Sequence, residues 1–166
     1  MSHDGRLVLP HRCIDPLSLG AGIFEQNWIF TMTHRIKVGA ELHTTNVFYG
    51  HIPDEQTGQE LVTRTMIEKV TFQRYRATKT VFGSGYVATA IDYSPVEIPE
   101  KQYELYDTLQ TGWPYSTEGE PYTFIWRVGT AFEPFFEEPG LFYVVIRFLP
   151  REGGETEMLT FEVTAK

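Results

Sequence analysis

The stretch Leu141-Phe142-Tyr143-Val144-Val145-Ile146-Arg147-Phe148-Leu149 is apolar at every position except Arg147. A run of this length, rich in β-branched and aromatic residues, is typical of a strand that is buried on both faces. Pro139-Gly140 precedes the run, and a polar stretch with Gly153-Gly154 follows it, so turns bound it on both sides. The next segment, Glu157–Thr164, alternates between apolar and polar residues. We therefore predict a central strand, a turn and a last strand that pair as a hairpin.

Similar patterns recur towards the N-terminus. Trp28–Val38 and Tyr122–Val128 alternate with a period of two, which indicates strands with one buried face. Leu61–Tyr75 is ambiguous, because Val62, Met66 and Val70 have helical spacing while the Val and Thr content favours a strand. We favour the strand. The predicted strands are Trp28–Val38, Glu41–Tyr49, Leu61–Tyr75, Tyr86–Tyr93, Tyr122–Val128, Leu141–Leu149 and Glu157–Thr164.

These segments predict an all-β fold. Seven or eight strands with turn residues between them favour a two-sheet antiparallel sandwich, immunoglobulin-like or jelly roll. Lys101–Leu109 is the best helix candidate, so we expect at most one short helix. The 166 residues fit a single domain, 1–166. Residues 1–22 are predicted to be an irregular lead-in, in which Leu7, Val8, Leu9 and Ile14 could dock on the body as an edge strand.

The closing hairpin resembles that of immunoglobulin-like domains. In both, a Pro-Gly turn leads into an aromatic-bearing central strand, and the last strand ends in Phe-x-Val, here Phe161-Glu162-Val163. The resemblance covers about a quarter of the chain and is a general pattern. The cysteine pair of antibody domains is absent, because the chain contains only Cys13.

Charge and composition exclude some classes of partner. The net charge is −8, which disfavours nucleic acid and anionic membrane surfaces. A single cysteine excludes an intrachain disulfide and favours a reducing compartment. Neither an apolar N-terminal run nor an 18-residue apolar stretch is present, so we expect a cytoplasmic protein.

Aromatic residues in predicted loops are the main candidates for a binding site. Trp113 and Tyr115 fall in one loop, and Phe132, Phe135 and Phe136 fall in another. Exposed aromatic residues of this kind often contact a partner. The alternative is that they fold back and fill the ends of the sandwich.

Catalytic and metal-binding patterns are weak. His34, His43 and His51 would converge if the first two strands paired, but their spacing matches no zinc signature. Cys13 with His11 lacks a third orienting group, and Gly83-Ser84-Gly85 is too short for a phosphate loop or a nucleophile elbow. We expect no cofactor.

The leading functional hypothesis is therefore a non-enzymatic interaction or assembly module. It would bind a protein partner or copies of itself through aromatic loops or a sheet edge. A small-ligand or carbohydrate-binding sandwich that uses Trp113 or Tyr115 for stacking is the second hypothesis. The third is a cupin-like metal-dependent enzyme that uses the three histidines.

Overall fold

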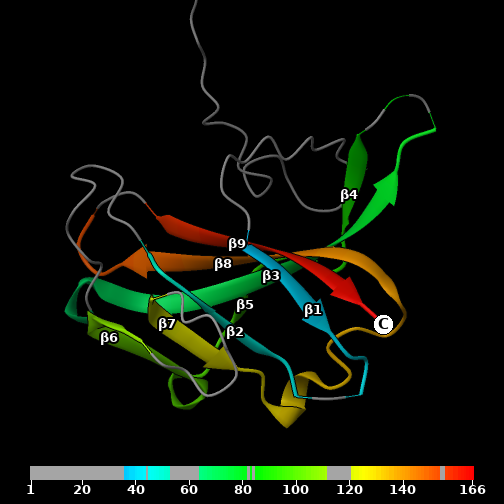
Figure 1. Cartoon of the computed structure of the whole chain (residues 1–166). Helices are drawn as coiled ribbons and strands as arrows, with labels where there is room; N and C mark the ends of the chain where they lie inside the picture. Colours follow the sequence, from blue (N-terminus) through cyan, green and yellow to red (C-terminus); the bar gives the residue numbers. More distant parts are fainter. Residues whose placement is uncertain are drawn as a thin grey trace, which may run out of the picture.

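Two β-sheets pack face to face in the computed structural model, which describes residues 36–43, 45–52, 64–81, 83, 85–111, 121–153 and 156–166 (Figure 1). Nine strands and three short 3₁₀ helices lie in these ranges. The strands are β1 (Ile36–Ala40), β2 (Val47–Gly50), β3 (Ile67–Lys79), β4 (Tyr86–Ala90), β5 (Val96–Glu97), β6 (Tyr103–Gln110), β7 (Tyr122–Arg127), β8 (Gly140–Pro150) and β9 (Glu157–Ala165). The 3₁₀ helices are η3 (Arg64–Met66), η4 (Glu100–Gln102) and η5 (Thr130–Phe132). The predicted all-β sandwich is confirmed.

The larger sheet has six strands in the order β1-β9-β8-β3-β4, and β5 also pairs with β3. The smaller sheet has the order β2-β7-β6. All pairs are antiparallel except β1 and β9, which are parallel with Ile36 opposite Phe161. The chain therefore crosses between the sheets several times, and residues far apart in sequence become neighbours.

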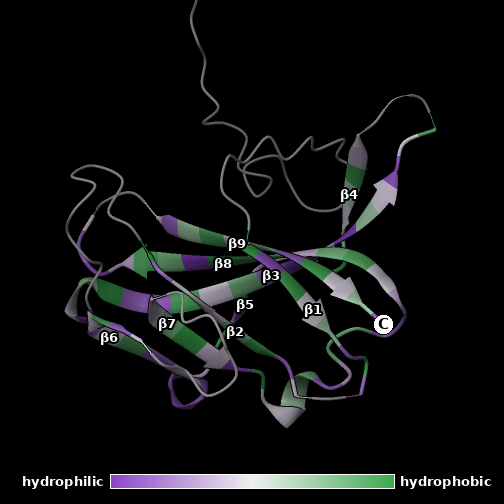
Figure 2. Cartoon of the chain, in the orientation of Figure 1, coloured by the Kyte–Doolittle hydropathy of each residue, from purple (hydrophilic) through white to green (hydrophobic). Residues whose placement is uncertain are grey.

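The central position predicted for Leu141–Leu149 is confirmed, because β8 lies between β3 and β9. Its hairpin with β9 places Val144 opposite Phe161 and Ile146 opposite Leu159. Figure 2 shows that β8 is hydrophobic along most of its length. Burial on both faces explains why this strand is the clearest in the sequence.

The main core lies between the two sheets and is built around aromatic rings. Phe72 of β3 packs against Trp126 of β7 with ring centroids 4.8 Å apart, and Phe48 of β2 lies 5.5 Å from the same indole. Phe124 of β7 meets Phe148 of β8 edge to face at 4.9 Å. These contacts join every layer of the sandwich and bury large apolar areas.

Three predictions about elements were wrong or incomplete. Lys101–Leu109 is not an α-helix: its first two residues end the 3₁₀ helix η4, and the rest belongs to strand β6. Tyr103 and Leu105 alternate towards the core, and pairing with β7 supplies the hydrogen bonds that a two-turn helix would lack. The second strand is only Val47–Gly50 rather than Glu41–Tyr49, and the two-residue strand β5 has no sequence signal. Of the predicted strand Trp28–Val38, residues 28–35 lie outside the described ranges.

The ambiguous stretch Leu61–Tyr75 is a strand from Ile67, which continues to Lys79. A tight turn follows β3, where the Thr80 N–H donates to the Gly85 carbonyl oxygen at 3.0 Å and Gly83 has a φ of 104°, a conformation that L side chains rarely adopt. Across the described ranges, no helix has both the length and the hydropathy needed to cross a membrane.

Candidate binding groove

A groove of about 1020 Å³ lies where the edges of the two sheets meet. Its walls come from β1 and the end of β9 on one side, and from β2 with the residues before it on the other. The lining residues are Lys37, Val38, Gly39, Ala40, Glu41, Thr45, Asn46, Val47, Phe48, Tyr49, Arg127, Glu162, Thr164 and Lys166. We call this feature the edge groove.

Both strands at the edge groove are terminal strands of their sheets. Within the described residues, β1 pairs only with β9, and β2 pairs only with β7. A terminal strand presents one row of backbone N–H and C=O groups to whatever lies beside it. The edge groove is therefore flanked by two such rows.

Charge in the edge groove differs from that of the chain as a whole. Three cationic side chains, Lys37, Arg127 and Lys166, line it together with two carboxylates, Glu41 and Glu162. The whole chain, by contrast, has 22 acidic and 14 basic side chains apart from histidine. The groove thus combines side chains of both charges with the apolar groups of Val38, Ala40 and Val47.

A tyrosine cluster adjoins the groove on the smaller sheet. The rings of Tyr49 and Tyr122 are 5.8 Å apart edge to face, and Tyr106 lies 6.1 Å from Tyr122. The Tyr106 hydroxyl donates a hydrogen bond to the carboxylate of Glu104, and Arg127 Nη1 lies 3.7 Å from that same carboxylate. This bond to Glu104, followed by partial burial, raises the pKa of Tyr106 to about 12. Glu104 thus orients both a tyrosine and a cation at the groove wall.

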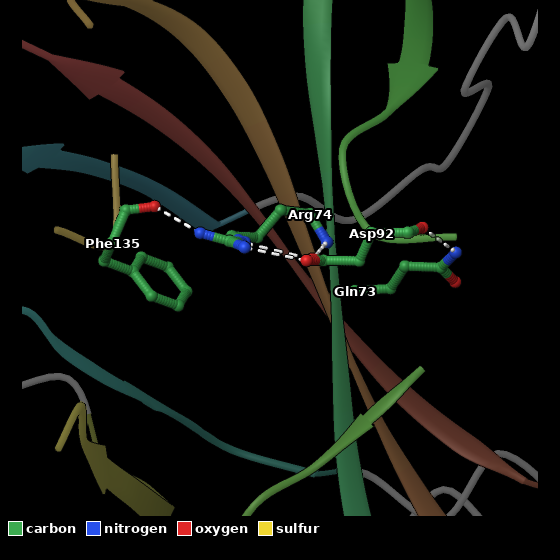
Figure 3. A network of polar contacts seen from close by, with 4 residues as sticks. All are labelled: Gln73, Arg74, Asp92 and Phe135. Carbon is green, nitrogen blue, oxygen red and sulfur yellow. Dashed lines mark hydrogen bonds and ion pairs between the residues drawn. The ribbon is translucent and has the colours of Figure 1, made fainter. Parts of the chain in front are cut away.

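A polar network joins the loop that contains Asp92 to the loop that contains Phe135 (Figure 3). Arg74 of β3 donates from Nε and Nη2 to the two carboxylate oxygens of Asp92, at 3.0 and 2.7 Å. Its Nη1 donates to the carbonyl oxygen of Phe135 at 2.6 Å, and its guanidinium lies 5.0 Å from the ring of that residue. Asp92 also accepts from the Arg74 backbone N–H. Arg74 therefore links the loop that contains Asp92 to the loop that contains Phe135.

The predicted aromatic site is divided by the structure. Phe135 and Phe136 are only 2% exposed and belong to the core, with their rings 4.9 Å apart. Phe132 is partly buried and meets Phe72 edge to face at 5.1 Å. These three residues fill the end of the sandwich, which is the alternative that the sequence left open. Trp113 and Tyr115 lie outside the described residues.

The predicted histidines are not brought together in the described part of the chain. His43 and His51 are both exposed, one in the turn after β1 and the other directly after β2. His34, His11 and Cys13 lie outside the described residues. Within the described ranges, no three side chains of the metal-binding types form a group.

Several surface residues escaped sequence reasoning. Val81 and Tyr93 are 89% and 81% exposed, although both are large and apolar.

The edge groove was missed because its residues become neighbours only through the parallel pairing of β1 with β9. The one available signal was the cluster of Lys37, Lys166 and Arg127 within otherwise acidic sequence, and those positions are too far apart to be read together.

Comparison with known proteins gives no relatives: no family model, no curated protein and no solved structure matches the chain.

Proposed function

We propose that the protein is a non-enzymatic interaction module whose edge groove takes an extended segment of a protein partner. The observation that carries the proposal is the groove itself, because the terminal strands of two sheets meet there beside apolar side chains. Addition of a strand to a free sheet edge is a common mode of peptide recognition, in which backbone hydrogen bonds supply affinity and alternate side chains supply specificity.

The groove chemistry indicates which segment fits best. An extended peptide places successive side chains on opposite sides, so one set would contact Val38, Ala40 and Val47. Carboxylates on the other set would pair with Lys37 or Lys166. We therefore propose a partner segment that alternates apolar and acidic residues.

The strand order supports an immunoglobulin-like assignment, which we propose as well. In immunoglobulin domains, strands B, E and D share one sheet and strands C, F and G share the other. With β2, β7 and β6 as B, E and D, and β3, β8 and β9 as C, F and G, both observed orders are reproduced. In this assignment β4 takes the place of the added C′ strand of variable-type domains. Phe72 on the strand equivalent to C lies at the centre of the core, where antibody domains have a tryptophan on that strand.

The test is selection of binding peptides followed by mapping of their site. Peptides selected from a random display library against the full chain would be added to isotopically labelled protein, and amide shifts would be followed by NMR. We expect the largest shifts in β1 and β2. The variant Thr164→Trp places a large ring at the groove wall and should weaken binding at least about tenfold.

Thr108→Trp is the matched control, because Thr108 is exposed on β6 and does not line the groove. It should bind like the wild type. Peptides that shift amides only elsewhere, or that bind equally well to both variants, would refute the proposal. If copies of the chain bind one another through the same edges, the solution mass of the free protein will exceed that of a monomer.

A further inference from the structure

The backbone groups that β1 directs towards the edge groove follow from its hydrogen bonds. The Ala40 carbonyl oxygen and the Leu42 N–H both bond to the residue that follows β9, at 3.0 and 3.3 Å, so these two residues face β9. Successive residues of a strand direct their backbone N–H and C=O groups to opposite sides. Lys37, Gly39 and Glu41 therefore direct theirs to the other side, where β1 has no partner among the described residues.

The side chains of β1 alternate in the same way. Ile36, Val38 and Ala40 pack against the main core, so Lys37 and Gly39 lie on the outer face of the larger sheet, where both are exposed. A strand added to this edge would place one set of its side chains beside Lys37 and Gly39. Its other set would face the apolar wall of the edge groove.

The edge of β2 is shorter. The Asn46 carbonyl oxygen accepts from the N–H that follows β7 at 3.0 Å, so by the same alternation β2 directs backbone groups to its free side only at Val47 and Tyr49. β2 ends at Gly50, where an added Cβ would lie 2.8 Å from the Ile36 Cδ1 atom of β1. The two sheets are thus in close contact at this end of β2, and β1 offers the longer row of backbone groups.

Gly39 is a glycine within a strand that nothing in the described chain requires. Gly83 has a positive φ, and Gly50 has no room for a side chain. Gly39 has neither a positive φ nor a described atom within 4 Å of an added Cβ. Glycine weakens a strand because it has no side chain to pack, and it often marks a place where a ligand or another backbone approaches. This position therefore indicates a neighbour that the chain itself does not supply.

The missing side chain leaves a gap on the outer face of the sheet. Lys37 and Glu41 flank the gap along the strand, and Thr164 of β9 lies opposite Gly39 on the paired side. Side chains that lie opposite each other on neighbouring strands stabilise a sheet, and an aromatic ring can compensate for a glycine by covering its bare backbone. Thr164 is too short to do so. A ring on an added strand would fill the gap.

We propose that the partner segment, which rests on the function proposed above, pairs with β1 and places an aromatic residue directly opposite Gly39. Its next residue on the same face is acidic and lies opposite Lys37. The segment runs antiparallel to β1, because antiparallel pairing is the more stable per residue. In that orientation the acidic residue follows the aromatic residue by two positions, and the residue between them faces the core side beside Val38. The recognition pattern is therefore aromatic-x-acidic with an apolar residue at x.

Parallel selections from a random peptide display library against the full chain test this pattern. The wild type should enrich peptides with aromatic-x-acidic. In Gly39→Glu a carboxylate occupies the gap, so basic residues should replace the aromatic residue at the same position, because opposite charges pair across strands. Gly153→Glu is the matched control: Gly153 is exposed, has no described atom within 4 Å of an added Cβ, and does not line the groove. It should select the wild-type pattern.

The affinity of one selected peptide gives a second readout. Replacement of its aromatic residue with alanine should weaken binding to the wild type and to Gly153→Glu by about fivefold or more, and to Gly39→Glu by less than about twofold. Equal losses in all three proteins overturn the proposal. Selected peptides that shift β1 amides but show no aromatic preference, or carry the acidic residue before the aromatic one, overturn this inference alone. Peptides that shift no amide of β1 or β2 overturn the proposed function as well.

A measurement on the wild type decides the matter if Gly39→Glu does not fold. We expect nuclear Overhauser effects between the ring protons of the bound peptide's aromatic residue and the α-protons of Gly39. Contacts of that ring with Tyr49 of β2 and none with Gly39 would place the peptide on the other edge, and this result overturns the proposal.

Discussion

Arg74 and Asp92 illustrate how burial decides what an ion pair contributes. Their side chains are mostly buried and joined by two hydrogen bonds (Figure 3), whereas the Arg76–Glu138 pair is much more exposed. An exposed pair contributes little because water screens it. Removal of one member of a buried pair is costly because the remaining charge is left without compensation.

We predict that Asp92→Asn lowers the free energy of unfolding by about 2 to 4 kcal/mol, because Arg74 stays largely buried without its counter-charge. Glu138→Gln is the matched control and should lower it by less than about 1 kcal/mol. Urea denaturation of both variants measures the difference. Equal losses would mean that the Asp92 pair contributes no more than a surface pair.

Tyr106 gives a prediction about pH. Its pKa is raised to about 12 because its hydroxyl donates to the Glu104 carboxylate, and this bond requires the neutral phenol. The stabilising contribution is therefore fully present below about pH 10, the ordinary pKa, and is lost as the pH rises through about 12. In Glu104→Gln, the Tyr106 pKa should fall towards 10. NMR of ring-labelled tyrosine measures this, with Tyr93 as an exposed reference in the same sample. An unchanged Tyr106 pKa in the variant would contradict the role of Glu104.

Single residues also show where sequence reasoning reached its limit. Phe135 and Phe136 have the composition and neighbours of an exposed binding loop, yet both lie in the core. Their placement depends on Arg74, which is about 60 residues earlier and holds the Phe135 carbonyl. Nothing local in the sequence distinguishes an aromatic residue that fills the end of a sandwich from one that faces solvent.

A strand could be predicted from the sequence when its own residues carry a clear apolar pattern. β7, β8 and β9 were found because alternation or continuous apolar sequence identifies them without reference to other elements. The sequence of Lys101–Leu109 favours a helix, and the strand conformation of β6 comes from pairing with β7. The edge groove could not be predicted, since it depends on which strands end each sheet.

The position of each strand in its sheet predicts its protection from hydrogen exchange. β8 has a partner on both sides and is buried on both faces, whereas the Tyr86 end of β4 pairs only with the end of β3. We predict that amides at 144–146 exchange more slowly than those at 86–88 by about two orders of magnitude or more. NMR-detected exchange at neutral pH measures both sets. Similar rates would indicate that the hairpin of β3 and β4 is as stable as the sheet centre.

The whole molecule has one main core shared by both sheets. Phe72 from the larger sheet touches Trp126 from the smaller sheet, and rings from β2 and the 132–136 loop surround this pair. The inner face of each sheet is buried by the other sheet. The two sheets should therefore unfold together.

We predict a single transition in urea, with the same midpoint for amides of β6 and of β9. Phe72→Ala should lower the free energy of unfolding by about 3 to 5 kcal/mol, because it removes a ring from the centre of the core, and it should shift both midpoints equally. Amide signals followed by NMR through the titration measure this. Separate midpoints for the two strands would show that the sheets have independent stability.

The parallel pairing of β1 with β9 has a consequence for synthesis of the chain. Ile36 and its partner Phe161 are 125 residues apart (161 minus 36), so translation supplies one long before the other. At the usual elongation rates the interval is on the order of 6 to 25 s. During that interval the emerging β1 has no ladder to join, and its apolar side chains are available to molecular chaperones. Closure of the larger sheet at this edge therefore has to wait for the synthesis of β9, and such non-local pairing is typical of slowly folding proteins.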